Sequence, residues 1–339
     1  MNKKVRIGIL GCASIAKKFT IKAFQSLDNA EVISIASRDI KKAKAYASLF
    51  TIPAYQLYDS LLKNSNVDAV YIPLPIGLHK EWVIKAAKMG KHVLSEKSLT
   101  TDFQSAKEII NTCKRANIVL YEDFMCDFHP QHQKVLSLIE NGEIGKPFIF
   151  NGNYGIPLMS PESFRYNKNL GGSALSEQGA YLVFMARKMF QSEPIWADAT
   201  LLYETEKGID MKGIAQLGFN NERVAHIAFS LDSTYQNNYS LWGNKGLIKV
   251  KRAYAIPSDM KPEIQLLRNE NLQESIESID APAADHFVLL FQDFCNTVTQ
   301  SNPKKISSIY EKILSQAKVL EAIRISSSEK RRVFVEEIR

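Results

Sequence analysis

A regular alternation between strand-like and helix-like segments in the first third of the chain constrains the fold more than any other feature. Strands that are apolar throughout and that alternate with helices are typical of a parallel sheet covered on both faces. We therefore predict a doubly wound Rossmann α/β domain. Segments with helical spacing separate the apolar runs, which are Val5–Leu10, Val32–Ala36, Ala69–Ile72, His92–Leu94 and Ile118–Tyr121.

The pattern changes after about residue 145, where strand-like runs follow one another without helices between them. Such a succession indicates an antiparallel sheet, and two helices near the C-terminus make this part α+β. A length of 339 residues also fits two domains at about 150 residues each. We expect domains at 1–125 and 126–339. The expected strands are 148–154, 197–202, 213–219, 223–231, 247–250 and 333–335, and the expected helices are 285–298 and 308–325.

The composition argues against several classes of partner. The 43 Lys and Arg residues exceed the 36 Asp and Glu residues by seven, but they occur in short scattered runs, so we expect no nucleic-acid partner. No run approaches the roughly 18 apolar residues that span a bilayer, and Arg6 interrupts the first apolar run, so we expect neither a membrane nor an export signal. The four cysteines lack zinc-site spacing. We predict reduced thiols, a cytoplasmic location and no metal site.

The first predicted strand runs into a turn of small residues. A dinucleotide-binding turn needs such residues because the backbone must approach a pyrophosphate at the N-terminus of the next helix. Of the three glycine places of the usual template, Gly11 fills one, and Ala13 and Ala16 fill the others. Small residues at such a turn can also serve packing alone. We predict a cofactor-binding turn over Gly11, Cys12, Ala13, Ser14 and Ile15.

The end of the second predicted strand bears on the choice of nicotinamide cofactor. An NAD site usually has an acidic residue there for the ribose 2′-hydroxyl, whereas this strand ends in Ser37 and Arg38. A serine hydroxyl can hydrogen-bond a 2′-phosphate, and a guanidinium can pair with it. Asp39 follows, and we expect it to cap the next helix. The sequence favours NADP(H) and leaves NAD(H) as the alternative, in which Arg38 is an ordinary solvated side chain.

Three segments together carry a family pattern: Val70–His79, Gly90–Ser98 and Gly171–Tyr181. In these segments the chain resembles the Gfo/Idh/MocA family of nicotinamide-dependent oxidoreductases, from about Val5 to Arg187 and in the family's order. The resemblance implies a Rossmann cofactor domain at 1–125. It also implies a substrate-binding and oligomerisation domain with an open antiparallel sheet at 126–339.

The resemblance also assigns roles to residues. Lys97 matches the lysine of the family's Glu-Lys-Pro motif beside the nicotinamide, and it would also contact substrate. Tyr181 matches the residue that usually serves as acid/base, since a phenol near a cation can donate a proton to an alkoxide. Arg165 would bind substrate or order its loop, and Glu177 would contact substrate. The remaining implied cofactor contacts are Leu74, Pro75, His79 and Glu96.

Three residues depart from the family pattern. Ser98 replaces the proline after the lysine, so a cis peptide bond is no longer favoured there. Glu177 replaces an aspartate, and Ile76 replaces an asparagine in the cofactor loop. We interpret these changes as tuning of substrate or geometry. Two further residues near the end of the last Rossmann strand, Glu122 and His129, could line the ligand crevice or serve as caps or core residues.

The leading hypothesis is an NADP(H)-dependent oxidoreductase that moves a hydride between nicotinamide and a secondary alcohol or ketone of a sugar derivative. The basic charge slightly favours a phosphate-bearing or nucleotide-linked sugar over a free one. One alternative is an NAD-dependent glycosidase-like relative. Another is a catalytically silent cofactor-binding sensor, to which Ser98, Glu177 and Ile76 give weight. By resemblance, we expect a homodimer or homotetramer formed through the C-terminal sheet.

Overall fold

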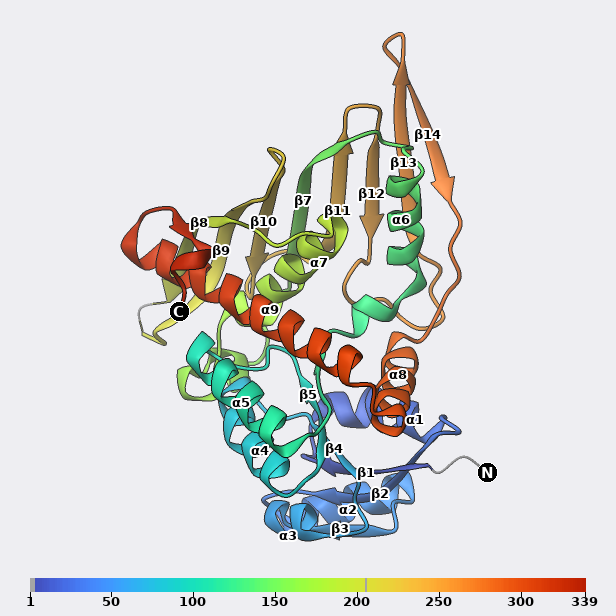
Figure 1. Ribbon diagram of the computed structural model, residues 1–339, viewed down its shortest axis with the longest axis vertical. Helices are drawn as coiled ribbons and strands as arrows, with labels where there is room; N and C mark the ends of the chain where they lie inside the picture. The colour runs from blue at the N-terminus through green and yellow to red at the C-terminus, as the bar shows by residue number, and fades with distance from the viewer. Residues whose placement is uncertain (1–3, 205) are drawn as a thin grey trace. The chain divides into compact units, whose positions relative to one another are not determined.

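The computed structural model describes residues 4–204 and 206–339 (Figure 1). The chain divides into two compact units, each made of two segments. The first unit contains the residues up to Met125 together with Phe287–Leu314, and the second contains Cys126–His286 together with Ser315–Arg339. The expected boundary after residue 125 coincides with the first crossing between units, but the C-terminal part of the chain is shared between them.

The first unit is built on a six-stranded parallel sheet with the strand order β3-β2-β1-β4-β5-β6. All five neighbouring pairs are parallel, which confirms the predicted Rossmann sheet. The β4 strand is buried along its whole length, as expected for a strand covered on both faces. The strands are β1 Val5–Leu10, β2 Ala30–Ala36, β3 Ala54–Gln56, β4 Ala69–Ile72, β5 His92–Glu96 and β6 Leu120–Asp123.

The helices of this sheet follow their strands in the expected order. Asp39 caps α2, where its side chain accepts a hydrogen bond from the Lys41 backbone amide at 2.8 Å, as the sequence predicted. The short α3 and the strand β3 before it were not predicted. The helices are η1 Ala16–Thr20, α1 Ile21–Gln25, α2 Ile40–Phe50, α3 Tyr58–Lys63, α4 Ile76–Lys88 and α5 Phe103–Ala116.

Helix α8 (His286–Gln300) returns to the first unit from far along the chain. Phe291 is fully buried and stacks on Phe24 of α1, with ring centroids 4.1 Å apart. Its ring centroid also lies 5.8 Å from that of Tyr71 in β4. We had expected this helix in the second domain, but aromatic burial against α1 and β4 places it with the Rossmann sheet.

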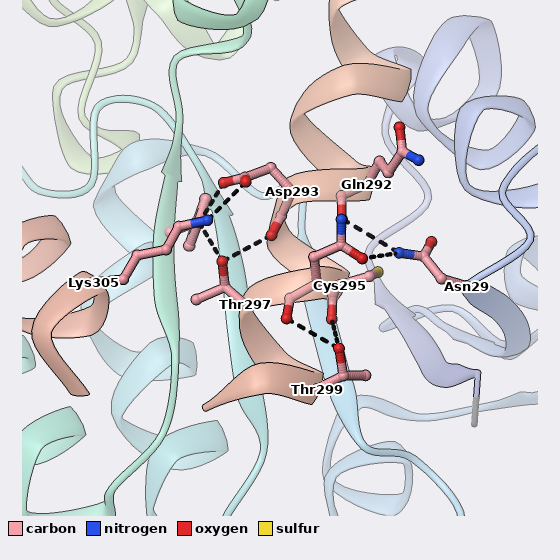
Figure 2. Close-up of polar contacts among 9 residues, drawn as sticks. Asn29, Gln292, Asp293, Cys295, Thr297, Thr299 and Lys305 are labelled. Carbon is pink, nitrogen blue, oxygen red and sulfur yellow. Dashed lines mark hydrogen bonds and ion pairs between the residues drawn. The ribbon is translucent and has the colours of Figure 1, made fainter. Parts of the chain in front are cut away.

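Polar contacts reinforce this return of α8 (Figure 2). The side-chain amide of Asn29 donates to the Gln292 carbonyl oxygen at 3.3 Å. Asp293 accepts hydrogen bonds from the Tyr121 hydroxyl and from the Lys305 ammonium, each at 2.7 Å. Lys305 belongs to α9 (Pro303–Glu329), so the start of that helix is also tied to the first unit.

The second unit contains a nine-stranded sheet in the order β14-β13-β12-β11-β7-β10-β9-β8-β15. Of its neighbouring pairs, only β7 and β10 are parallel among the described strands, which confirms a mostly antiparallel sheet. Strands β11, β13 and β14 were not predicted. The strands are β7 Pro147–Gly155, β8 Trp196–Glu204, β9 Ile209–Gly218, β10 Val224–Ser230, β11 Gln236–Gly243, β12 Leu247–Lys251, β13 Glu263–Glu270, β14 Gln273–Ile279 and β15 Val333–Phe334.

Helices η5 (Leu175–Gly179) and α7 (Ala180–Phe190) form one continuous helical segment on this sheet. Gly152 of β7 allows the close approach, because a Cβ atom there would lie 2.9 Å from the side chain of Leu182. The helix α6 (Pro130–Glu140) precedes β7 along the chain. Within the described residues, no helix is both long enough and apolar enough to cross a membrane.

Candidate active site

The turn after β1 has the close packing that a dinucleotide-binding turn requires. Gly11 has a φ of +144°, and a Cβ atom there would lie 3.0 Å from the side chain of Leu74, so glycine is needed at this position. Helical residues begin at Ser14, which leaves free backbone amides next to the turn. Burial raises the pKa of the Cys12 thiol. A small, neutral surface therefore faces the place where a pyrophosphate would bind.

The residues after β2 form a polar corner beside that turn. Ser37 is buried, and its hydroxyl accepts a hydrogen bond from the Asp39 amide at 3.2 Å. Because Asp39 caps α2, its carboxylate is already engaged by the backbone. Arg38 is exposed. The corner thus offers one hydroxyl and one exposed guanidinium, a combination suited to a phosphate group.

The loop after β4 is braced by a histidine. His79 of α4 is fully buried. Its Nε2 atom lies 2.7 Å from the Leu74 carbonyl oxygen, and its Nδ1 atom lies 3.0 Å from the Ser98 carbonyl oxygen. His79 therefore ties the loop at Leu74 and Pro75 to the segment after Lys97. Ile76, which replaces the family's asparagine, is 3% exposed and serves as a packing residue.

Lys97 follows the last residue of β5 and is only 8% exposed. The Lys97–Ser98 peptide bond is cis, so the expectation drawn from the missing proline was wrong. The surrounding contacts fix the backbone there. The Ser98 carbonyl oxygen meets His79, and the Leu99 amide donates to a Glu122 carboxylate oxygen at 2.7 Å.

The ends of β5 and β6 bring together a polar cluster that sequence reasoning missed. Glu96 accepts a hydrogen bond from the buried Tyr71 hydroxyl at 2.6 Å. Asp123 pairs in register with Glu96 and is fully buried. Parallel strands end at the same edge of a sheet, so the acidic ends of these two strands were the available signal. Neither Tyr71 nor Asp123 had a role in the sequence-based site.

Two of the predicted substrate contacts meet in the second unit. The Arg165 Nε donates to the Glu177 carboxylate at 2.9 Å, and Glu177 is 5% exposed. Gly172 makes this possible, because a Cβ atom there would lie 2.3 Å from the Arg165 carbonyl oxygen. A buried carboxylate paired with a guanidinium has a fixed position. Glu177 is therefore tied to Arg165 by a charge-assisted hydrogen bond, and whether that arginine also binds substrate is a matter for the proposed function.

Tyr181 lies one helical turn after Glu177, at the start of α7. It is 6% exposed, and its ring centroid lies 5.5 Å from that of Tyr154 and 6.1 Å from that of Tyr254. The helical segment is anchored by Asp210 of β9, whose carboxylate accepts a hydrogen bond from the Leu175 amide at 2.7 Å. This anchor lies far along the chain and had no signal in the local sequence.

The two residues left open in the sequence have structural contacts. The Glu122 carboxylate accepts a hydrogen bond from the Leu99 backbone amide, as described above. The Nδ1 atom of His129 accepts a hydrogen bond from the Gln131 amide at 3.2 Å, so His129 caps α6. Burial lowers the pKa of His129 to about 4. In the part of the chain that the structure describes, no group of His, Cys, Asp or Glu side chains could hold a metal ion.

Comparison with known protein families gives one match in each of the two units. The signature of an oxidoreductase family with an NAD-binding Rossmann fold covers residues 5–124, and the Gfo/Idh/MocA C-terminal domain covers residues 132–249. The chain belongs to the Gfo/Idh/MocA oxidoreductases. It is 33% identical to a dTDP-3,4-didehydro-2,6-dideoxy-α-D-glucose 3-reductase of Saccharopolyspora spinosa over 95% of this chain and 97% of the relative.

Other Gfo/Idh/MocA relatives carry similar names. A D-xylose 1-dehydrogenase (NADP(+)) of Haloferax volcanii is 33% identical over 76% of this chain and 79% of the relative. Among solved structures, a 3-ketoreductase from Actinomadura kijaniata in complex with NADP and TDP-benzene has a TM-score of 0.91 and 31% identity. That match covers 96% of this chain and 98% of the relative. The family and the oxidoreductase class predicted from the sequence are thus confirmed.

Proposed function

We propose that the protein is an NADP(H)-dependent reductase that acts on a ketone of a nucleotide-linked sugar. The observation that carries this proposal is the match along nearly the whole chain to 3-ketoreductases of dTDP-sugars. A solved structure of one such relative is named as a complex with NADP and TDP-benzene. The proposed reaction interconverts the ketone and the secondary alcohol of the sugar.

The residues of the first unit fit a bound NADP(H), which supplies the hydride. Gly11, with a backbone conformation that favours glycine, and the helix start at Ser14 suit the pyrophosphate. In this proposal Cys12, Ala13 and Ile15 complete that turn. Ser37 and Arg38 bind the 2′-phosphate, since Asp39, the acidic residue that follows them, caps α2.

The loop over the cofactor consists of Leu74 and Pro75, and His79 holds it in place. Glu96 completes the set of proposed cofactor-binding residues. Because His79 is fully buried, its contribution to cofactor binding is one of positioning rather than of direct contact. Lys97 serves both cofactor and substrate in this proposal.

The acid/base chemistry follows from two side chains. Reduction of a ketone leaves a negative charge on the substrate oxygen, which must receive a proton. In this proposal Tyr181 donates that proton, and the Lys97 ammonium stabilises the charge on the same oxygen. A solved relative exists with one tyrosine changed to phenylalanine and another with one lysine changed to alanine. Those two positions are the same number of residues apart as Lys97 and Tyr181.

Substrate binding is assigned to Arg165, which Glu177 holds in place. A guanidinium fixed by a buried carboxylate can present its remaining N–H groups to sugar hydroxyls or to a phosphate. In this proposal Glu177 is thereby a positioning residue and also a substrate contact.

The test uses a panel of sugar substrates, and the oxidation of NADPH with each one is monitored by nicotinamide absorbance. We expect NADPH oxidation with a TDP-linked 3-keto sugar and much slower oxidation with the matching free keto-sugar. Tyr181→Phe should lower kcat by about 10²- to 10⁴-fold, the usual contribution of general acid catalysis. Hydrolysis without net reduction would indicate the glycosidase-like alternative, and binding without turnover would indicate a sensor.

We also infer that the protein is cytoplasmic and that copies associate through the open face of the second-unit sheet. All four cysteines are buried and none forms a disulfide, which suits a reducing compartment.

The proposed assembly surface is the open face of the second-unit sheet. Ile214 and Trp242, in strands of that sheet, are 61% and 51% exposed. Apolar side chains left exposed on a sheet often mark an interface. Light scattering after size exclusion should give a dimer or a tetramer, and a monomer would refute this assembly.

A further inference from the structure

The end of β6 carries a buried carboxyl group that the proposed reaction does not use. Asp123 is fully buried, and it pairs in register with Glu96 at the end of β5. Within the described residues, neither of its carboxylate oxygens has a hydrogen-bond partner at regular geometry. An isolated carboxylate is costly to bury, so the charge on Asp123 must be set by its neighbours.

The neighbour on β5, Glu96, accepts a hydrogen bond that favours its ionised form. The Tyr71 hydroxyl donates to Glu96 at 2.6 Å, and a donated hydrogen bond stabilises a carboxylate over a carboxylic acid. Burial, followed by the charge of Glu96, raises the pKa of Tyr71 well above its ordinary value. The phenol therefore keeps its proton and donates it to the hydrogen bond with Glu96, which favours the negative charge of the pair on Glu96.

A fully buried carboxyl group does not ionise readily beside a second, partly buried one that carries a charge. Burial and then the Glu96 charge raise the pKa of Asp123 well above its ordinary value, and the Lys97 charge opposes them. The groups that act on Asp123 are thus Glu96 and Lys97 from the end of β5 and the backbone of Met125, and Tyr71 of β4 lies within electrostatic range of Asp123.

We propose that Asp123 retains a proton, so that the Glu96–Asp123 pair carries one negative charge beside the one positive charge of Lys97, and that the reaction requires this balance. The inference rests on the proposed role of Lys97 in stabilising charge on the substrate oxygen. Loss of the Asp123 proton would add a second negative charge beside Lys97 and weaken that stabilisation. Asp123 is a positioning residue because it acts through Glu96 and Lys97.

The kinetic test is the pH dependence of kcat for Asp123→Asn and Asp123→Glu. The asparagine variant keeps the pair at one negative charge at every pH. Its kcat near neutral pH should stay within about threefold of the wild-type value. The pH at which kcat falls on the alkaline side should rise by about one unit or more. In Asp123→Glu, kcat should fall at the same alkaline pH as in the wild type. An unchanged profile in the asparagine variant, or a loss of more than about tenfold near neutral pH, would overturn the inference.

A second measurement does not depend on turnover. Infrared difference spectra of the protein, recorded between about pH 5 and about pH 10, should show the carbonyl band of a protonated carboxyl group. That band should be missing in Asp123→Asn. The matched control is Asp59→Asn, because the Asp59 side chain is 68% exposed, and it should change neither the band nor the pH profile.

The two measurements separate failure of this inference from failure of the proposed function. If the carbonyl band changes with pH but the protein reduces no keto-sugar, the proposed reaction is refuted and the protonated state of Asp123 is still supported. Reductase activity without the band would refute the protonated Asp123 alone.

Discussion

Gly172 offers a sharp test of how the second unit positions Arg165. In Gly172→Ala, the new Cβ atom would lie 2.3 Å from the Arg165 carbonyl oxygen, 2.8 Å from its carbonyl carbon and 2.9 Å from the Asn167 nitrogen. Ordinary contacts begin at about 3.5 Å. All three atoms belong to the backbone, so no side-chain rotation can relieve the overlap. The loop must therefore move by about 1 Å.

This displacement has a predictable effect on activity. The Arg165–Glu177 contact of 2.9 Å would lengthen beyond a normal hydrogen bond. A misplacement of about 1 Å can lower the rate by about 10²-fold, so we expect kcat/KM to fall by that amount. Overpacking should also lower the free energy of unfolding by about 1 to 3 kcal/mol.

The assay compares kcat/KM, NADPH affinity and urea unfolding in two variants. Gly142→Ala is the control, because Gly142 has a φ of +76° with nothing within 4 Å of a new Cβ atom. This control should lose about 1 to 2 kcal/mol of stability with unchanged kcat/KM. NADPH affinity should stay at the wild-type value in both variants. Wild-type kcat/KM in Gly172→Ala would refute the role given to the Arg165 loop.

Three further predictions follow from other contacts. Phe291→Ala should lower the free energy of unfolding by about 3 to 5 kcal/mol in urea titration, because the ring is fully buried and stacks on Phe24; a loss under about 1 kcal/mol would contradict the placement of α8. Arg38→Asp should raise the Kd of NADPH by about 10- to 100-fold and leave that of NADH nearly unchanged in fluorescence titration, whereas equal changes would show that Arg38 does not contact the phosphate. Asp123→Asn should stabilise the protein increasingly as pH rises. The raised folded pKa of Asp123 means that the wild type loses stability between the unfolded value, about 3.9, and the folded one. Thermal unfolding over a pH series measures this difference, and a difference independent of pH would contradict it.

The parallel sheet was predictable because its strands bury both faces. Runs such as Ala69–Ile72 are apolar at every position, and the turns and helices between them have their own local signals. The strands missed in the second unit lack such signals. Strand β11 contains Asn237 and Asn238, residues more typical of turns. Strand β14 is exposed along nearly its whole length, so it shows no alternation of apolar residues.

The sequence offers signals for site residues only where these follow one another in the chain. The turn at Gly11 and the segment from Glu177 to Tyr181 are local patterns. Contacts between distant segments had no such pattern. Asp210 anchors the helix before Tyr181 from another strand, and α8 gives no sign in its sequence of which unit it joins.

Deuterium transfer tests the central claim most directly. The protein is incubated with a TDP-linked 3-keto sugar and NADPH labelled with deuterium at nicotinamide C4, in both stereochemical forms, and the product sugar is analysed by mass spectrometry and NMR. We expect one labelled form to deliver its deuterium to the former ketone carbon, and we expect solvent D₂O to label no carbon there. A reduced product with carbon-bound deuterium from solvent, or no transfer from either labelled cofactor, would contradict it.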